Sequence, residues 1–169
     1  MPASLADLPA LVTARLELAP LRIADAPAFQ ALTDDSAITG AVHFLASPFT
    51  LADAEALIRQ REQGRDCFIG AWHREDGDLV GTVGTHLRGG DALEIGYWIA
   101  SARHGQGYGG EAAGAVIEML RRGFPARRIL AECRRENAAS WRLLERLGFR
   151  ATGDAGIRPG RELLEQLPL

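Results

Sequence analysis

The sequence predicts a single-domain α/β protein whose mixed β-sheet starts as an antiparallel meander and continues through one parallel crossover. Three strand-like runs, CFIGAWH, LVGTVGTHL and ALEIGYWIA, form the meander over residues 67–99 and are separated only by the turn sequences EDGD and RGGD. Connections this short join antiparallel neighbours. A helical pattern then separates residues 93–99 from a further strand-like run, RILAECR, at 128–134. A strand–helix–strand unit of this length places its two strands parallel, with a right-handed crossover.

The chain before the meander predicts one strand and a short helix. Residues 13–18, TARLEL, alternate apolar and polar side chains, which is the period of a half-buried strand. Asp25 is placed to cap a short helix that carries Phe29 and Leu32.

A second helix is predicted from Thr50 to about Gln63. Thr50 and Asp53, three residues later, form a variant of the capping box. One face of this helix is expected to carry Leu51, Ala54 and Ile58.

The second half of the chain predicts two more helices around the last strand of the crossover. The first helix follows a glycine-rich loop and ends before Pro125, which cannot continue it. Its apolar residues recur at helical spacing and are Ala112, Ala113, Val116, Ile117 and Leu120. Asn137 caps the second helix, which ends at Gly148. Its apolar residues are Leu143, Leu144 and Leu147. From Arg150 onward the pattern fits either a turn and a final strand or a short helix.

Length and composition limit the possible functions. A chain of 169 residues buries a sizeable core without disulfides or metals. Cys67 and Cys133 lie in strand-like runs without metal-ligand spacing, so both are predicted to be reduced core thiols and no metal is expected. The net charge of −3 argues against a general nucleic-acid partner, and no apolar run approaches the ~20 residues of a membrane span. The opening MPASLADLPALV lacks the pattern of a signal peptide, which favours a cytoplasmic location.

The stretch from His104 to Gly114, HGQGYGGEAAG, is rich in glycine and opens directly into a helix. Gly105, Gly107 and Gly110 satisfy GxGxxG, but antiparallel strands precede the loop and only one crossover unit is present, which disfavours a dinucleotide fold. No GK[ST] follows, so a nucleoside-triphosphate P-loop is disfavoured as well. The remaining interpretation is an exposed backbone at a helix N-terminus, where unpaired N–H groups and the helix dipole favour an anion such as pyrophosphate.

These residues carry a family resemblance. ARHGQGYGGEAAG resembles the acyl-CoA pyrophosphate loop of the GNAT acetyltransferases, and NAASWRLLERLGF resembles the asparagine-led helix motif that follows it. TARLELAPL, EIGYWIA and HGQGYGGEA resemble more narrowly the branch of ribosomal-protein-alanine N-acetyltransferases. The resemblance covers residues 13 to about 152. It implies a GNAT-like fold, with a sheet that splays between the two parallel strands and the pantetheine arm of acetyl-CoA in the split.

The resemblance also implies which residues bind acetyl-CoA, the expected cosubstrate. The loop backbone would hold the pyrophosphate, and the end of the preceding strand would pair with the pantetheine amides. Asn137 would contact the arm as well as cap its helix, with a cap alone as the alternative, and Arg103 is a candidate for the 3′-phosphate. The cofactor-binding residues implied in this way are Trp98, Ile99, His104, Gly105, Gln106, Gly107, Tyr108, Gly109, Gly110 and Asn137. The tail looks shorter than the usual closing hairpin of the family.

Direct acetyl transfer needs a base for the amine, a donor for the oxyanion and a group that stabilises the thiolate. By resemblance, a backbone N–H near Ile99 is the oxyanion donor. Leu144 stands where many members have a tyrosine that protonates the thiolate. Ser140, one helical turn beyond Asn137, is therefore the candidate donor to the sulfur, with an ordinary first-turn serine as the alternative.

The base remains open between several groups. Glu94 and His86 lie on strands beside the expected cleft, and His43 lies in the segment that shapes the acceptor pocket in this branch. A water chain is a further alternative. The predicted catalytic residues are Ser140, Glu94 and His86.

Together these features predict an N-acetyltransferase that moves an acetyl group from acetyl-CoA to a primary amine without a metal or a covalent intermediate. A noncatalytic acyl-CoA-binding module is the alternative, because the tyrosine is missing and the base is not assigned. The expected acceptor is a small-molecule amine or a protein N-terminus, with no nucleic-acid or membrane partner. The protein is expected to be a monomer or a homodimer.

Overall fold

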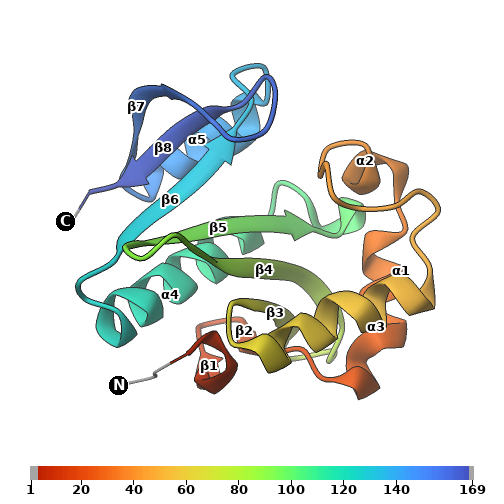
Figure 1. Cartoon of the computed structure of the whole chain (residues 1–169). Helices are drawn as coiled ribbons and strands as arrows, with labels where there is room; N and C mark the ends of the chain where they lie inside the picture. Colours follow the sequence, from red (N-terminus) through yellow and green to blue (C-terminus); the bar gives the residue numbers. More distant parts are fainter. Residues whose placement is uncertain (1–3, 168–169) are drawn as a thin grey trace.

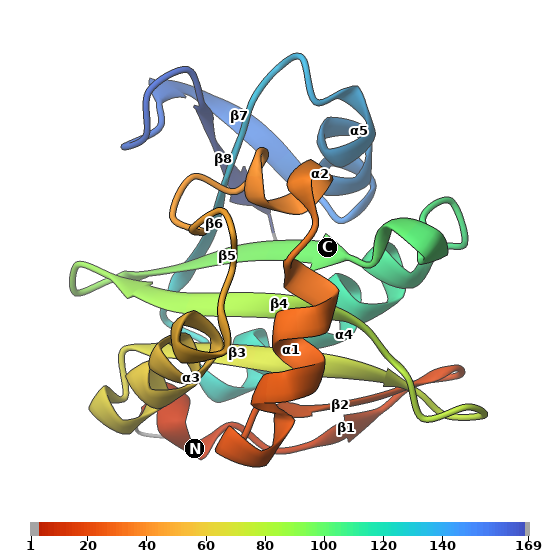
Figure 2. The same cartoon turned by 90° about the vertical axis from the view of Figure 1, so that its right-hand side faces the viewer.

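The computed structural model describes residues 4–167 and contains one eight-stranded mixed sheet with helices on both faces (Figures 1 and 2). The strand order is β1-β2-β3-β4-β5-β6-β8-β7, which confirms the predicted fold class. The strands are β1 (Leu11–Val12), β2 (Leu16–Pro20), β3 (Asp66–His73), β4 (Leu79–Arg88), β5 (Ala92–Ile99), β6 (Arg128–Cys133), β7 (Phe149–Ala155) and β8 (Glu162–Gln166). The α-helices are α1 (Ala26–Thr33), α2 (Ser36–Thr39), α3 (Leu51–Arg59), α4 (Tyr108–Gly123) and α5 (Ala138–Arg146).

The predicted antiparallel meander is formed by β3, β4 and β5. Its register places Asp66 opposite His86 and His86 opposite Glu94, so the three side chains form one row on the same face of the sheet. The next row on that face contains Gly84 and Gly96. A Cβ at Gly96 would have no neighbour within 4 Å, which leaves open space beside the polar row.

The strands β5 and β6 are parallel, as predicted, and are connected through α4. Their pairing is short, because residues 92–94 pair with residues 128–130 and the ladder ends there. On its other side β6 pairs with β8. The sheet therefore opens into a V between β5 and β6, which confirms the expected splay and is visible in Figure 1 between the green and cyan strands.

The helix α4 covers one face of the sheet, and α1 and α3 cover the other (Figure 2). Side chains alternate along β5 between two buried clusters. Leu93 packs with Val116 and Leu120 of α4, whereas Trp98 packs with Phe29 of α1. Each large apolar side chain buried in this way stabilises the fold by roughly 2 kcal/mol.

The start of α3 confirms the predicted capping box. The hydroxyl of Thr50 accepts a hydrogen bond from the N–H of Asp53, and the carboxylate of Asp53 accepts one from the N–H of Thr50. The apolar face was predicted correctly only in part. Ala54 and Ile58 are buried, but Leu51 is 42% exposed because it lies in the first turn, before the part of the helix that packs inward.

Two of the other predicted helix ends need correction. The helix α3 ends at Arg59 and Gln60–Gln63 form a 3₁₀ helix, so the α-helix is shorter than predicted. Asp25 precedes α1, but its carboxylate accepts from the N–H of Arg22, so it closes the preceding 3₁₀ turn instead of capping α1. The helix α4 ends shortly before Pro125. At the start of α5, Oδ1 of Asn137 accepts from the N–H of Ser140 at 3.3 Å and caps the helix as predicted.

The tail forms a β-hairpin, so a final strand is the correct alternative and a short helix is wrong. The strand β8 lies between β6 and β7. The strand β7 was not predicted, because every residue of this strand after Phe149 is exposed and the alternation typical of a half-buried strand is missing. The tail was expected to be shorter than the closing hairpin usual in the family. The strands β7 and β8 do form a hairpin, which reaches Gln166.

Both cysteines, Cys67 and Cys133, are free and buried, as expected for core thiols. Within residues 4–167, no helix has the length and the apolar character needed to span a membrane. The same part of the chain has no group of three or more His, Cys, Asp or Glu side chains arranged to hold a metal ion.

Candidate active site

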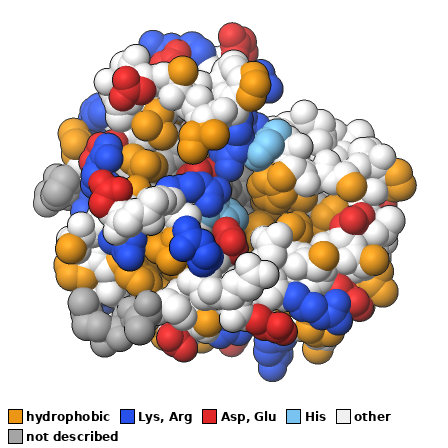
Figure 3. Space-filling model, viewed as in Figure 1, with side chains coloured by type: hydrophobic (Ala, Val, Ile, Leu, Met, Phe, Trp, Pro, Cys, Tyr) orange, Lys and Arg blue, Asp and Glu red, His pale blue; other side chains and the backbone are white. Residues whose placement is uncertain are grey.

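A cleft of about 1030 Å³ opens where β5 and β6 separate. Its walls come from β5, the glycine-rich loop, α5, the segment around α2 and the loop between β7 and β8. Figure 3 shows the molecule from the side of Figure 1, with arginine and histidine side chains gathered at the hollow. The volume is at the upper end of the range for small-molecule and cofactor sites.

The glycine-rich loop has a backbone conformation that side chains rarely adopt. The φ angle is 73° at Gly105 and 85° at Gly107, in the left-handed region that glycine enters without a steric penalty. Gly107 is the N-cap residue of α4 and has no side chain with which to cap it. The first N–H groups of α4 are therefore available to a ligand, and the helix dipole favours an anion there.

Arg15 braces this loop. Its Nη1 donates to the carbonyl of Gln106 at 2.8 Å, its Nε donates to Glu111 at 2.7 Å, and its guanidinium lies 4.2 Å from the centre of the Tyr108 ring. Glu111 also accepts from the hydroxyl of Thr13 and from the N–H of Arg15. Burial alone would raise the pKa of Glu111, but these hydrogen bonds lower it. Glu111 is thus held ionised and fixes Arg15, which in turn fixes the loop.

The edge of β5 that faces the cleft offers unpaired backbone groups. The N–H of Ala100 donates to the carbonyl of Val80 at 2.9 Å, so even-numbered residues of β5 bond to β4. Backbone groups of an antiparallel strand alternate between its two sides, so those of Ile95, Tyr97 and Ile99 face the V. The ladder with β6 has already ended there, so these groups, except the Ile99 carbonyl that His104 contacts, suit an extended ligand that carries amides.

His104 and Trp98 hold the end of β5 in different ways. Nε2 of His104 lies 2.8 Å from the carbonyl oxygen of Ile99, so the ring ties the loop to the strand. The backbone of Trp98 pairs with β4, and its indole Nε1 donates to Thr33 at 3.1 Å. The predicted backbone pairing with pantetheine therefore does not fit Trp98, and alternation assigns that role to its neighbours. Trp98 still lines the cleft with its side chain.

Ser140 and Tyr97 form a pair of hydroxyl groups across the cleft. The Tyr97 hydroxyl lies 2.9 Å from Oγ of Ser140, and burial raises the pKa of Tyr97 to about 12, so the phenol keeps its proton at neutral pH. Leu144 is buried in the same wall and places no polar group there. The structure thus brings the Tyr97 hydroxyl to the serine that was predicted to meet the sulfur.

His86 is the best-oriented titratable side chain in the cleft. Its Nδ1 lies 2.6 Å from Oδ1 of Asp66, and the ring is 8% exposed. The hydrogen bond from His86 lowers the pKa of Asp66. An ionised carboxylate can only accept, so Nδ1 carries a proton, and in the neutral imidazole Nε2 then has the lone pair. Neutral His86 is therefore arranged to accept a proton at Nε2.

Glu94 is held as an ion by two arginines. Arg88 donates to it at 2.8 Å and Arg158 at 2.6 Å. Burial would raise the pKa of Glu94, but the hydrogen bond and charge of Arg158 and the charge of Arg88 lower it, so the geometry does not favour Glu94 as a base. His43 accepts at Nε2 from Nε of Arg158, at 2.9 Å. Burial and the Arg158 charge lower the pKa of His43, whose lone pair is thus already in use.

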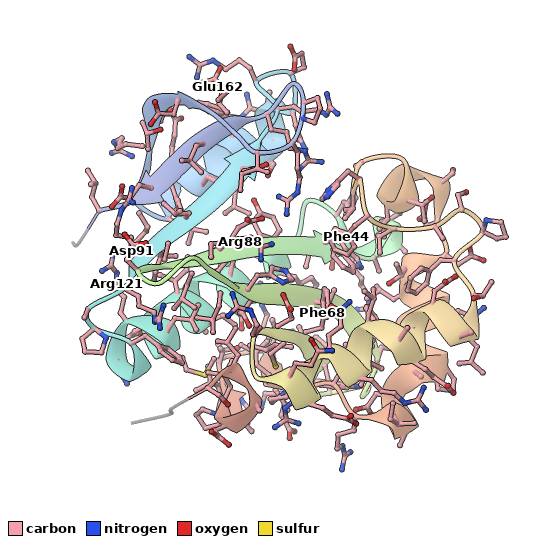
Figure 4. The ribbon with its side chains drawn as sticks, in the orientation of Figure 1. Phe44, Phe68, Arg88, Asp91, Arg121 and Glu162 are labelled. Carbon is pink, nitrogen blue, oxygen red and sulfur yellow. The ribbon has the colours of Figure 1, made fainter. Side chains whose placement is uncertain are left out.

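An aromatic wall stands beside this polar row. Phe44 and Phe68 lie close to Trp98, with ring centres 6.1 Å and 6.0 Å from its ring. Figure 4 shows Phe44, Phe68 and Arg88 around strands β4 and β5. The floor at Gly96 is open, because a Cβ there would meet nothing within 4 Å. We call the part of the cleft around His86, Glu94 and Gly96 the acceptor half; its surface is partly apolar and partly charged.

Comparison with known proteins identifies the family. A family model described as an acetyltransferase (GNAT) domain matches residues 15–150. The chain belongs to the GNAT acetyltransferases. Enzymes of this family use acetyl-CoA as the acyl donor, so acetyl-CoA is the cosubstrate.

Similar proteins agree with this GNAT assignment. YnaD of Bacillus subtilis (strain 168), named an uncharacterized N-acetyltransferase, is 28% identical over 106 residues, and the match spans 62% of this chain and 62% of YnaD. The solved GNAT-family acetyltransferase from Bacillus anthracis has a TM-score of 0.81 at 23% identity, covering 94% of this chain and 98% of that chain. The ribosomal-protein-S5-alanine acetyltransferase from Vibrio fischeri has a TM-score of 0.78 at 17% identity, covering 93% and 94%. The predicted likeness to the ribosomal-protein branch is confirmed at the level of the fold.

The cleft of this GNAT acetyltransferase fits acetyl-CoA. The uncapped start of α4 suits the pyrophosphate, and the free edge of β5 suits the two amides of pantetheine. Arg103 is less suited to the 3′-phosphate, because it already donates to Asp76 and Asp78 at 3.0 Å each. Four further site residues could not be predicted from the sequence, because their roles depend on contacts between distant segments: Arg15, Asp66, Tyr97 and Arg158.

Proposed function

We propose that this GNAT acetyltransferase transfers the acetyl group of acetyl-CoA directly to the nitrogen of a primary amine. The observation that carries the proposal is the composition of one continuous cleft. It is lined by the glycine-rich loop, by the free edge of β5 and by His86, which Asp66 orients. A donor site and a proton-accepting group thus open into the same space, as direct transfer requires.

The donor half of the cleft binds acetyl-CoA, which supplies the activated thioester. The N–H groups of residues 104–110 hold the pyrophosphate, and the backbone of Ile95 and Tyr97 pairs with the pantetheine arm. Asn137 contacts the arm through its side-chain nitrogen, since its oxygen caps α5.

The acceptor half removes a proton from the amine, which makes its nitrogen nucleophilic. Nε2 of His86 takes the amine proton, directly or through one water, while Asp66 stabilises the imidazolium that results. Glu94 stays ionised between its arginines and shapes the site instead of accepting the proton.

The remaining charge develops on the carbonyl oxygen and on the sulfur. The N–H of Ile99, on the side of β5 away from β4, donates to the oxyanion. The hydroxyl of Ser140 donates to the thiolate, and Tyr97, which keeps its proton at neutral pH, supports that serine.

The acceptor is a small-molecule amine or a protein N-terminus. The S5-alanine acetyltransferase that shares the fold is named for a protein acceptor, which supports the second class. The proposed reaction requires neither nucleic acid nor a membrane, and a cytoplasmic monomer or homodimer suffices for it.

The proposal is tested by measuring free thiol released from acetyl-CoA with four acceptor pools. The pools are peptides beginning with Ala or Ser, amino acids, polyamines and aminoglycosides. We expect release above blank with one pool. Acetyl-CoA at about a hundred times its Kd should also raise the Tm by about 5–10 °C. Stabilisation without release from any pool would favour an acyl-CoA-binding module, whereas no stabilisation would refute the donor site.

A further inference from the structure

Arginine side chains outnumber the buried carboxylates around the acceptor half of the cleft. Glu94 and Glu132 are the buried carboxylates, with side chains 7% and 1% exposed. Arg88 bonds to Glu94, and Arg158 bonds to both carboxylates. The two buried carboxylates thus form their ion pairs with Arg88 and Arg158, and neither forms one with Arg161.

Arg161 lies in the loop before β8 and points into the same cleft. Its Nη2 donates to the carbonyl of Ala41 at 2.7 Å. Its Nε is buried and has no hydrogen-bond partner, and among residues 4–167 it forms no ion pair with a carboxylate. Burial and the neighbouring charges of Arg158 and Arg134 lower the pKa of Arg161. A buried N–H donor without an acceptor, next to other positive charges, destabilises the folded protein. An anion bound beside Arg161 would remove this cost.

The surroundings of Arg161 add further donors. The guanidinium of Arg134 lies close to Gly160, where a Cβ would come within 2.8 Å of its Nη1, and Arg134 also lines the cleft. Arg158 uses Nη1 for the carboxylates and Nε for His43. A planar guanidinium matches the two oxygens of a carboxylate or phosphate better than any neutral group.

We infer that Arg161, with Arg134 and Arg158 beside it, binds an anionic oxygen group, a carboxylate or a phosphate, on the amine that this enzyme acetylates. The inference rests on the proposed function and names its substrate class. The acceptor is a small molecule, because the loop between β7 and β8 is tied across the cleft to the α2 segment. Arg161 reaches Ala41 and Arg158 reaches His43, which narrows the passage that a protein chain would need.

The test compares matched amines that differ only in the anionic group. The pairs are 4-aminobutyrate with 4-aminobutyramide, and 2-aminoethyl phosphate with ethanolamine. Binding is measured by calorimetry in the presence of CoA, and acetylation by thiol release. The proteins are wild type, Arg161→Met, Arg161→Lys and the control Arg122→Met, whose side chain is 77% exposed on α4.

We expect wild type to prefer an anionic member over its neutral partner by about tenfold or more, and the preference to fall with salt. Arg161→Met should lose most of this preference, Arg161→Lys should keep part of it, and Arg122→Met should keep all of it. Preference for 2-aminoethyl phosphate over 4-aminobutyrate, or the reverse, would identify the phosphate or the carboxylate as the recognised group.

Two results would overturn the inference. One is equal binding of anionic and neutral members by wild type, or no detectable binding of either anionic amine. The other is an anionic preference that Arg161→Met leaves intact. In both cases the rise in Tm with acetyl-CoA reports the donor site separately, so failure of the anion site is distinguishable from failure of the acetyltransferase assignment. The same rise shows whether the variants fold.

Discussion

The Nδ1 atom of His86 lies 2.6 Å from Oδ1 of Asp66, across the register that pairs these residues on β4 and β3. Because Asp66 accepts this bond, the lone pair of the neutral His86 ring is on Nε2, and His86 lines the cleft. The pair needs no loop movement to form, since both side chains stand on adjacent strands of the meander.

This geometry predicts a large loss of turnover when His86 is changed. His86→Gln should lower kcat by roughly 10²- to 10³-fold, because the amine loses its proton acceptor. Asp66→Asn should also lower kcat, because the amide can donate to Nδ1 and shift the imidazole proton to Nε2. Thiol release at saturating acetyl-CoA measures both effects. The rise in Tm with acetyl-CoA should be unchanged, and nearly normal turnover in His86→Gln would assign the base elsewhere.

The hydroxyl pair of Ser140 and Tyr97 predicts graded effects on thiolate release. Ser140→Ala should lower kcat by about tenfold or more, since the developing charge on sulfur loses its donor. Tyr97→Phe removes the hydroxyl that bonds to Oγ and to the carbonyl oxygen of Ser140, and should lower kcat by about fivefold. Steady-state kinetics with one acceptor measures both. If Ser140→Ala lowers the Tm but leaves kcat unchanged, the serine only satisfies the helix end.

The glycine-rich loop predicts a loss of donor binding when it gains a side chain. Gly107 has a φ of 85°, and an added Cβ would lie 3.4 Å from Arg15, so Gly107→Val distorts the loop and blocks approach of the pyrophosphate. We expect this variant to lose the rise in Tm with acetyl-CoA. Gly90→Ala is the matched control, because its Cβ would meet nothing within 4 Å and its φ is not positive. A normal rise in Gly107→Val would mean that the loop does not contact the donor.

The elements that could be predicted from the sequence are those whose signals lie within a short window of residues. The meander and the crossover were predictable because turn length and helix spacing lie within short windows. The hairpin of β7 and β8 was not, since β7 is anchored by Phe149 alone and pairs through a backbone that leaves no apolar pattern. Leu51 followed the helical period but lies before the packed turns of α3.

In the site, too, some features could be predicted from local sequence and others could not. The anion-binding character of residues 104–110 follows from glycine content and position, which are visible in the sequence. The choice between His86 and Glu94 depended on partners from other segments. Asp66 orients the histidine, whereas Arg158, from the far hairpin, holds the glutamate. The sequence positions of these residues do not indicate that they contact each other.

Glu94 predicts an acid-sensitive contribution to stability. Its pKa in the folded protein is lowered, so the stabilisation is fully present above the pKa of the unfolded chain, about 4.3, and is lost as the pH falls through the folded pKa. At pH 7, Glu94→Gln should lower the free energy of unfolding by about 3 kcal/mol, because Arg88 and Arg158 lose their shared partner. Below about pH 4 the difference between wild type and variant should shrink as wild-type Glu94 becomes protonated.

Urea unfolding of wild type and Glu94→Gln at pH 7 and at about pH 3.5 measures the two differences in the free energy of unfolding. Glu55→Gln, which removes only an exposed pair with Arg59, should change stability by less than about 0.5 kcal/mol at either pH. A deficit in Glu94→Gln that stays constant with pH would show that the carboxylate contributes by packing and not through its charge.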